Sequence, residues 1–406
     1  MKQPVLVILL LMTLVACDPP PPPLTDVPFD SGELEGVRLV QPTSIVFGTD
    51  GRLYVSELGG RIVAMSLSED GRTTTSVDVI AEDDVFNQVL GLAFDTGGQQ
   101  PALYLSHNFV NGTADGPFAN EIVKLTAPDF SESEVVISGL PVSGHNHGTN
   151  DLEFGPDGRL YIAQGGTTSS GAPADADDPR WRDWDESPLS GAILVADVNA
   201  ADFNGEILYD SELATSETEM IGGDVSVFSP GHRNTYDIMF HSNGYLYSLD
   251  NGSSEPVPAS MDCETLGPPP DNDPDQLNRV VEDAYYGHAN RNRGRDDPRQ
   301  CRNLSPFDES VADGMLLLVP PSSNALLEVT EGVFPEDWHG DLLFAWWSGG
   351  DIRRLLLADD GQSVEGQEIV LQGLGAPLSM ATDPASGIIY IAEFGAGVIT
   401  YLAPTD

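Results

Sequence analysis

Leu152-Glu-Phe-Gly-Pro-Asp-Gly-Arg-Leu-Tyr-Ile-Ala163 is the stretch of sequence that decides the fold. Its apolar and aromatic residues flank a short polar centre and have strand propensity. Asp157-Gly158 supplies the positive φ that a tight hairpin turn needs, so the stretch predicts two antiparallel strands. The same phrase recurs as Ser44–Ser56, Ile238–Ser248 and Met380–Ala392, and more loosely as Leu92–Asp95 with Leu103–Leu105 and as Asp341–Ala345.

Six copies of one hairpin phrase predict an all-β fold, a six-bladed β-propeller. Repeats of about 40 residues or more, with several strands each and no helical periodicity, are typical of propeller blades. A β-sandwich, the alternative, would not repeat one motif at this interval. We expect residues 37–40 to complete the last blade and close the ring, which would hide the sheet edges. Long insertions at 168–226 and 253–318 are expected to line the binding face.

The N-terminus predicts an exported lipoprotein. Residues 5–15 form an apolar run that is shorter than the roughly 20 residues of a membrane-spanning helix. The run has the length of a signal-peptide core. It ends in Leu14-Val15-Ala16-Cys17, which resembles the bacterial lipobox, in which the cysteine receives lipid and becomes the new N-terminus. The alternative is an ordinary signal peptide followed by an incidental cysteine.

These features divide the chain into three parts. Residues 1–16 are the expected lipoprotein signal peptide, and residues 17–35 hold the lipidated Cys17 and a spacer with five consecutive prolines. Such a proline run is stiff and extended, so it would hold the folded part away from a membrane. Residues 36–406 are the expected propeller. We therefore expect a lipid-anchored protein at the periplasmic or cell-surface face of a bacterial membrane.

Charge excludes one class of partner. Without residues 1–16, which contain one basic residue, the chain has 17 basic and 64 acidic residues and a net charge of −47. A surface this negative repels phosphate backbones, so we expect no nucleic acid partner. Clustered carboxylates also favour bound calcium. Cys263 and Cys301 remain after lipidation of Cys17, and in an oxidising compartment they are expected to form a disulfide.

Two polar clusters precede the third and fourth blades: Gly144–Asp151 and Ser229–Thr235. His147 can accept a proton from a hydroxyl when its imidazole is neutral, so it is the candidate base. Arg233 offers a planar fork suited to a carboxylate or a quinone oxygen, and Asn234 can hydrogen-bond either way. The spacing is equally compatible with His147 as a hydrogen-bonded packing residue.

Other polar residues are expected to be structural or solvated. His145, His232 and His288 are each expected to have a structural role. The acidic residues Glu57, Asp250 and Glu393 each follow an inner strand, and we expect them to be ordinary solvated side chains.

Over the whole mature part, the chain resembles the glucose/sorbosone dehydrogenase family, which includes soluble quinoprotein glucose dehydrogenase and the aldose sugar dehydrogenases. The resemblance rests on the spacing from His147 to the hairpin phrase of the third blade. It rests further on Gly231-His-Arg-Asn234, on Asp250-Asn-Gly-Ser253, and on Asp275-Gln-Leu-Asn-Arg279 followed by Tyr285-Tyr-Gly287.

The resemblance implies a propeller that binds pyrroloquinoline quinone (PQQ) and calcium. His147 resembles the general base that takes the proton of the sugar C1 hydroxyl, while the hydride passes to the quinone. Arg233, Asn234 and Asn251 match cofactor-binding positions. Gly252 and Ser253 match the positions whose backbone carbonyls bind calcium, with Ser253 where the family usually has proline.

Three departures from the family bear on the cofactor. A quinone-binding lysine is replaced near Ser348, arginines are replaced within Gly375–Ser379, and Leu316–Val319 stands where a tryptophan and a threonine are expected. PQQ carries three carboxylates, so missing cations weaken its binding. Arg353 and Arg354 lie near in sequence and are candidate replacements.

The sequence leaves two functions open. The first is a PQQ-dependent oxidoreductase that oxidises an aldose sugar or related alcohol at the outer face of a membrane and passes electrons to a respiratory acceptor. The second is a non-catalytic, calcium-stabilised propeller that binds carbohydrate or an exported protein. A lactonase-type hydrolase would need a buried calcium ringed by carboxylates, and the sequence shows no such ring.

Overall fold

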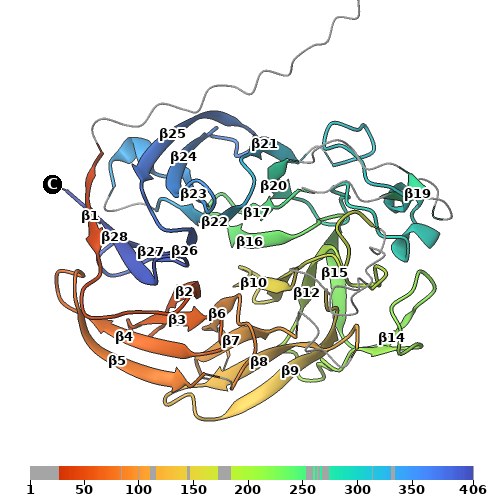
Figure 1. Cartoon of the computed structure of the whole chain (residues 1–406), viewed down its shortest axis with the longest axis horizontal. Coiled ribbons are helices and arrows are strands. Elements are labelled where there is room, and N and C mark those ends of the chain that lie inside the picture. Colours follow the sequence, from red (N-terminus) through yellow and green to blue (C-terminus); the bar gives the residue numbers. More distant parts are fainter. Residues whose placement is uncertain are drawn as a thin grey trace, which may run out of the picture.

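A computed structural model describes residues 27–405, except 84, 99, 110–115, 144–146, 172–183, 253–258, 261–262, 264–265, 268–273, 313 and 331–333. Six four-stranded antiparallel sheets are arranged around a common centre (Figure 1). The six-bladed propeller is therefore confirmed. The innermost strands of neighbouring blades contact one another all the way round, so the ring is closed.

The first three blades follow the chain from the centre outward. Blade 1 consists of β2 (Pro42–Phe47), β3 (Leu53–Glu57), β4 (Ile62–Leu67) and β5 (Thr74–Ala81). Blade 2 consists of β6 (Leu92–Asp95), β7 (Ala102–His107), β8 (Asn120–Thr126) and β9 (Ser133–Leu140). Blade 3 consists of β10 (Thr149–Phe154), β11 (Leu160–Gln164), β12 (Ala192–Ala196) and β15 (Val225–Pro230).

The other three blades complete the ring. Blade 4 consists of β16 (Thr235–Phe240), β17 (Leu246–Asp250), β20 (Asp275–Val280) and β21 (Met315–Val319). Blade 5 consists of β22 (Ser323–Glu328), β23 (Leu342–Trp346), β24 (Asp351–Leu357) and β25 (Val364–Gln372). Blade 6 consists of β26 (Pro377–Thr382), β27 (Ile389–Glu393), β28 (Val398–Pro404) and β1 (Phe29–Glu33).

Short elements decorate the loops. Two small hairpins are formed by β13 (Leu208–Tyr209) with β14 (Met220–Gly222) and by β18 (Ala259–Ser260) with β19 (Leu266–Gly267). Single 3₁₀ turns are η2 (Arg293–Arg295), η3 (Pro298–Cys301) and η4 (Glu336–Trp338). Within the described ranges, the chain forms no helix long and apolar enough to cross a membrane.

The repeated phrase forms the two inner strands of a blade for a local reason. In blade 3, Gly158 has a φ of 80°, which the tight turn requires. The Asp157 carboxylate accepts the backbone N–H of Arg159 at 3.1 Å, which fixes the turn. The phrase also carries one aromatic residue per blade on the second strand, and these six side chains are buried between the blades: Tyr54, Tyr104, Tyr161, Tyr247, Phe344 and Tyr390. Local turn chemistry and the core thus favour the same hairpin.

In several blades, a side-chain oxygen on the inner strand accepts a backbone hydrogen bond from the next blade. The hydroxyl of Ser44 accepts the N–H of Leu92 at 3.2 Å, and that of Ser379 accepts the N–H of Ile45 at 3.1 Å. Asp151 and Asp237 do the same in blades 3 and 4. The Asp151 carboxylate accepts the N–H of Ile238 at 3.2 Å, and the Asp237 carboxylate accepts that of Leu326 at 2.9 Å.

The strand that closes the ring is not the one predicted. β1 pairs with β28, and the predicted residues 37–40 lie outside any strand. The propeller therefore begins before residue 36. Phe29 anchors β1 by packing edge-on against Phe334 and Trp338. The segment Phe29–Glu33 contains Asp, Ser and Gly, which have low strand propensity, so pairing with the open edge of β28 decides its conformation.

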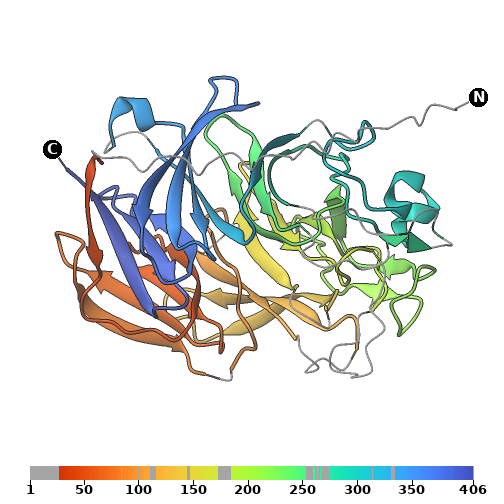
Figure 2. The same ribbon diagram turned by 45° about the horizontal axis from the view of Figure 1, so that its top comes forward.

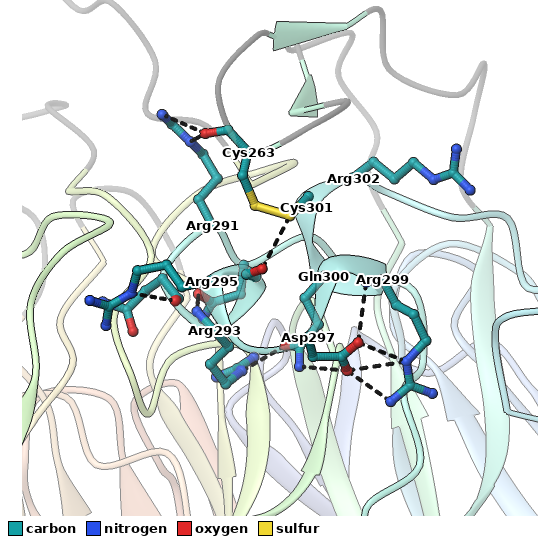
Figure 3. The surroundings of a disulfide bond; sticks show 12 residues. Cys263, Arg291, Arg293, Arg295, Asp297, Arg299, Gln300, Cys301 and Arg302 are labelled. Carbon is teal, nitrogen blue, oxygen red and sulfur yellow. Dashed lines mark hydrogen bonds and ion pairs between the residues drawn. A yellow bond between two sulfur atoms is a disulfide. The ribbon is translucent and has the colours of Figure 1, made fainter.

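The two predicted insertions each enclose a blade strand. Residues 168–226 include β12, and residues 253–318 include β20, so each region contains two separate loops. The loops around residues 197–224 and 281–312 project from the same side of the ring (Figures 1 and 2). The predicted disulfide between Cys263 and Cys301 is present and joins the loop after β17 to the loop after β20 (Figure 3).

Candidate active site

Two loops meet at one mouth of the propeller, as the ring of blades predicts. His147 is buried directly before β10, and Asn234 is buried directly before β16. Both side chains lie against Gly165, which follows β11. A Cβ atom on Gly165 would lie 2.8 Å from the Cβ of His147 and 2.9 Å from the Oδ1 of Asn234. The residues of the two predicted clusters therefore share one small space.

His147 is held in one tautomer. Its Nδ1 lies 2.9 Å from the carbonyl oxygen of Gly166. Because a carbonyl can only accept, Nδ1 carries the proton, and the lone pair is on Nε2. Burial lowers the pKa of His147 well below its ordinary value, and the positive charge of Arg233 lowers it further. His147 is therefore neutral at ordinary pH, which is the state that a base requires.

Arg233 holds the blade 3 insertion against blade 4. Its Nε donates to the carbonyl of Ser169 at 2.9 Å, and its Nη2 donates to the hydroxyl of the same serine at 3.1 Å. Its Nη1 donates to the carbonyl of Asn251 at 3.1 Å. The planar fork expected to bind a carboxylate or a quinone oxygen thus already donates to three protein oxygens.

A chain of side-chain amides runs from Asn150 in β10 toward blade 5. Asn150 donates to the Oδ1 of Asn234 at 2.9 Å, and the Nδ2 of Asn234 lies 3.3 Å from the Oδ1 of Asn251. Asn251 donates to the Asp275 carboxylate at 2.7 Å, which also accepts the N–H of Gly252 at 3.0 Å. Burial raises the pKa of Asp275. The predicted residues Asn234, Asn251 and Gly252 are therefore contiguous.

The expectation that Glu57, Asp250 and Glu393 are solvated is wrong, because all three are buried and accept backbone N–H groups from the loop that enters their own blade. Glu57 accepts from Val40 at 3.0 Å, and Glu393 accepts from Gly375 at 2.5 Å. Asp250 accepts from Arg233 at 3.0 Å and Asn234 at 2.8 Å, and burial raises its pKa to about 6. Buried loop amides need an acceptor, which an acidic residue ending a second strand supplies.

Glu186 is a site residue that the sequence analysis did not single out. It is fully buried in the blade 3 insertion, and its Oε1 lies 3.0 Å from the Nε2 of His288. Although burial alone would raise its pKa, the hydrogen bond and charge of His288 and the hydroxyls of Ser190 and Thr168 lower it to about 2. Only the fold brings residues 186 and 288 together, so no local sequence signal marks the pair.

His232 has the structural role expected of it. Its ring stacks on Tyr286 with centroids 4.5 Å apart, and its Nε2 lies 3.0 Å from the hydroxyl of Ser229. Burial lowers the pKa of His232 to about 3. His145 lies outside the described residues.

The calcium prediction concerns backbone carbonyls and not acidic side chains. Among the residues that the structure describes, no group of three or more His, Cys, Asp or Glu side chains could hold a metal ion. The predicted ligands are the backbone carbonyls of Gly252 and Ser253. Gly252 lies beside Asn251 at the mouth, whereas Ser253 lies outside the described residues. Calcium binding at Gly252 and Ser253 therefore stays a prediction.

The described residues do not match the charges of PQQ. Arg353 pairs with Asp351 at 3.1 Å and stacks on Trp346, and Arg354 pairs with Asp341 at 2.6 Å. Both arginines are buried, so the hypothesis that they replace the missing cations is wrong. Arg233 is committed to Ser169 and Asn251. Two more arginines, Arg180 and Arg182, lie outside the described residues. Arg233, Arg353 and Arg354 thus all donate to protein oxygens, whereas the three carboxylates of PQQ need cations that are free to pair with them.

Six blades thus surround a mouth that holds a neutral histidine in one orientation. The glucose/sorbosone dehydrogenase family matches residues 39–398, and the chain belongs to that family. No curated protein matches the chain.

Solved structures share the fold at low sequence identity. An oxidoreductase of Thermus thermophilus, described as a glucose dehydrogenase, is 22% identical, with a TM-score of 0.61 over 92% of this chain and 99% of that chain. The soluble aldose sugar dehydrogenase of Escherichia coli is 15% identical, with a TM-score of 0.61 over 93% and 100%. The PQQ-bound aldose sugar dehydrogenase of Streptomyces coelicolor is 17% identical, with a TM-score of 0.57 over 94% and 99%.

Proposed function

We propose that this protein is an oxidoreductase of the sugar dehydrogenase type that oxidises a hydroxyl of an aldose or a related alcohol. The observation that carries the proposal is the Nδ1–H tautomer of the buried His147, because it leaves Nε2 as a neutral base at the mouth. Membership of the glucose/sorbosone dehydrogenase family supports the same activity.

The chain's own residues account for the proton in this reaction. The Nε2 of His147 accepts the hydroxyl proton of the substrate, and the resulting imidazolium keeps its Nδ1–H on the carbonyl of Gly166. Arg233 disfavours this positive charge, so the proton is readily passed on to solvent. Oxidation also removes a hydride from the carbon that carries this hydroxyl, and a bound redox cofactor must accept the hydride. The relatives' cofactor, PQQ, does not fit the charges of the described residues, so no step is assigned to it.

A second candidate function follows from that misfit. A propeller that kept the family fold but lost its quinone would bind carbohydrate or an exported protein at the same mouth, stabilised by calcium. The observation that favours it is the commitment of Arg233, Arg353 and Arg354 to protein oxygens.

Reconstitution separates the two functions. The purified protein is incubated with PQQ and Ca²⁺, and quinone binding is followed by calorimetry and turnover by dye reduction on a panel of sugars. Quinone binding with turnover supports the oxidoreductase. Sugar binding without quinone binding or turnover supports the second function. Omitting Ca²⁺ tests the metal prediction, because a site at Gly252 and Ser253 would make quinone binding calcium-dependent.

We also propose that Cys17 carries lipid and anchors the protein to the outer face of a bacterial membrane, close to a respiratory electron acceptor. The support is the sequence Leu14-Val15-Ala16-Cys17 and the proline spacer that follows it, all of which lie outside the described residues. Cys17→Ser should release the protein from the membrane fraction of an expressing bacterium. Unchanged sedimentation with membranes would remove the support for lipidation.

A further inference from the structure

One peptide group connects His147 to Glu186. The carbonyl of the Gly166–Thr167 peptide accepts the Nδ1–H of His147 at 2.9 Å, and the N–H of the same peptide donates to the Oε2 of Glu186 at 3.2 Å. We infer that Glu186 is a positioning residue that holds His147 in place through this peptide and stabilises the imidazolium formed when His147 takes a proton. The inference rests on the proposed function, in which His147 is the base.

The Glu186 carboxylate has an elaborate set of donors. Its Oε1 accepts the N–H of Thr168 at 3.0 Å, the hydroxyl of Thr168 at 2.6 Å, and His288 at 3.0 Å. Its Oε2 accepts the hydroxyl of Ser190 at 2.5 Å in addition to the Thr167 amide. Because every one of these donors favours the ionised form, a full negative charge is kept in the interior.

A peptide that bridges a carboxylate and an imidazole is polarised. The carboxylate draws on the N–H, which raises the electron density on the carbonyl oxygen and strengthens its bond to Nδ1–H. When His147 takes a proton, the charge of Glu186 stabilises the imidazolium across the peptide, in the low-dielectric interior. Glu186 raises the pKa of His147, whereas Arg233 and His288 lower it.

The space around Gly166 is closely packed. A Cβ atom on Gly166 would lie 2.7 Å from the Nε2 of His288 and 3.1 Å from the Oε1 of Glu186. The charged groups that act on Glu186 from the packed loops are His288, Arg293 and Asp185. Arg293 also donates to the carbonyls of the insertion at Pro188, Ser190 and Gly191, which holds Glu186 in place.

Glu186→Gln tests the inference, because glutamine keeps the shape and removes the charge. The readout is the NMR spectrum of histidine-labelled protein, which does not depend on turnover. In the unaltered protein His147 should be the Nδ1–H tautomer with a strongly deshielded proton. E186Q should shift that proton to lower frequency, because the Gly166 carbonyl becomes a weaker acceptor for Nδ1–H once the charge of Glu186 is removed. If the dehydrogenase activity is established, kcat should fall roughly tenfold in E186Q with KM unchanged.

Thr168→Val is the matched control, because it removes one hydroxyl donor from Glu186 and keeps the carboxylate. It should lower the thermal midpoint and leave the His147 tautomer unchanged. If E186Q lowers the midpoint with no change in the His147 signal, Glu186 only holds the loop and the inference is overturned. Should E186Q fail to fold, Glu186→Asp keeps the charge and should retain the strongly deshielded Nδ1–H signal of His147, and loss of that signal in this variant is the contrary result. Absence of turnover with the predicted NMR shift would defeat the proposed function alone.

Discussion

Asp151 and Asp237 lie on neighbouring inner strands, and their carboxyl groups are hydrogen-bonded to one another. Each also accepts a backbone N–H from the next blade. Serines make the equivalent bond elsewhere in the ring, so the two aspartates add a titratable group to a structural link. Burial raises the pKa of Asp151 to about 7 and that of Glu153, two residues further on, to about 8.

The contribution of these carboxyls to stability should therefore fall as the pH rises through the range from about 4 to about 8. Over this range the folded protein keeps protons on these carboxyls that the unfolded chain releases, so the free energy of unfolding decreases. Asp237→Asn keeps an acceptor for Leu326 and removes one charge, so its thermal midpoint should depend less on pH. At pH 8 the thermal midpoint of D237N should exceed that of the unaltered protein by ~2–4 °C for each kcal/mol of unfolding free energy that the substitution restores.

Ser379→Ala is the control for this prediction, because it breaks an equivalent link without a titratable group. Its midpoint should fall equally at both ends of the pH range. Identical pH profiles for the unaltered protein and D237N, measured by calorimetry, would contradict the raised pKa values.

Arg233→Met should free the blade 3 insertion from blade 4. Methionine fills much of the same space but makes none of the three hydrogen bonds to Ser169 and Asn251. Amide hydrogen exchange at residues 167–171 should become at least tenfold faster, because the loss of roughly 1.5–3 kcal/mol of charge-assisted bonding allows local opening. Exchange in the outer strand β5 should stay unchanged. Equal protection of residues 167–171 in both proteins would show that other contacts hold the insertion.

Gly166→Ala should destabilise the protein, because the added methyl group would lie 2.7 Å from His288 and 3.1 Å from Glu186. We expect a loss of about 1–3 kcal/mol, as for other overpacked sites. Gly366→Ala is the matched control, since its nearest neighbour would lie at 3.8 Å. Denaturant unfolding measures both variants, and an equal effect at the two positions would refute the packing that the structure gives to Gly166.

Reduction of the disulfide between Cys263 and Cys301 should lower the stability by about 2–4 kcal/mol, since the bond closes a loop across 38 residues of sequence. Thermal unfolding with and without a thiol reductant measures the effect. Five arginines lie between residues 291 and 302 beside this bond (Figure 3). Among them, Arg291 donates two hydrogen bonds to the carbonyl of Cys263, so freeing the loop should also expose Arg291. An unchanged midpoint after complete reduction would mean that the loops are held by other contacts.

The sequence predicts the ring because each blade repeats the same local sequence signals for a hairpin. The turn at Asp157-Gly158 and the aromatic residue of the second strand are both local, and together they specify the inner hairpin of a blade. The outer strand β1 could not be predicted in the same way. It forms because β28 offers an open edge, and nothing local in Phe29–Glu33 favours a strand.

The candidate site likewise contains residues that the local sequence predicts and contacts that only the fold creates. His147 and Asn234 were predictable, since each stands next to a recognisable inner strand. The commitment of Arg233 to Ser169 and the pairing of Glu186 with His288 depend on how long loops pack, and these partners are 64 and 102 residues apart in sequence. The buried state of Asp250 was missed because its partners are loop amides, which no side-chain pattern reveals.

The central claim is that His147 is a neutral base at the mouth of the propeller, and its most direct test is the rate of sugar oxidation in His147→Gln. Glutamine retains a donor for the carbonyl of Gly166 and cannot take a proton. With a redox cofactor that the protein accepts, the unaltered protein should reduce a dye with at least one aldose, and H147Q should lose roughly 10²–10⁴-fold in kcat with an unchanged thermal midpoint. Equal rates in the two proteins, or no turnover of any sugar by either, would contradict the account.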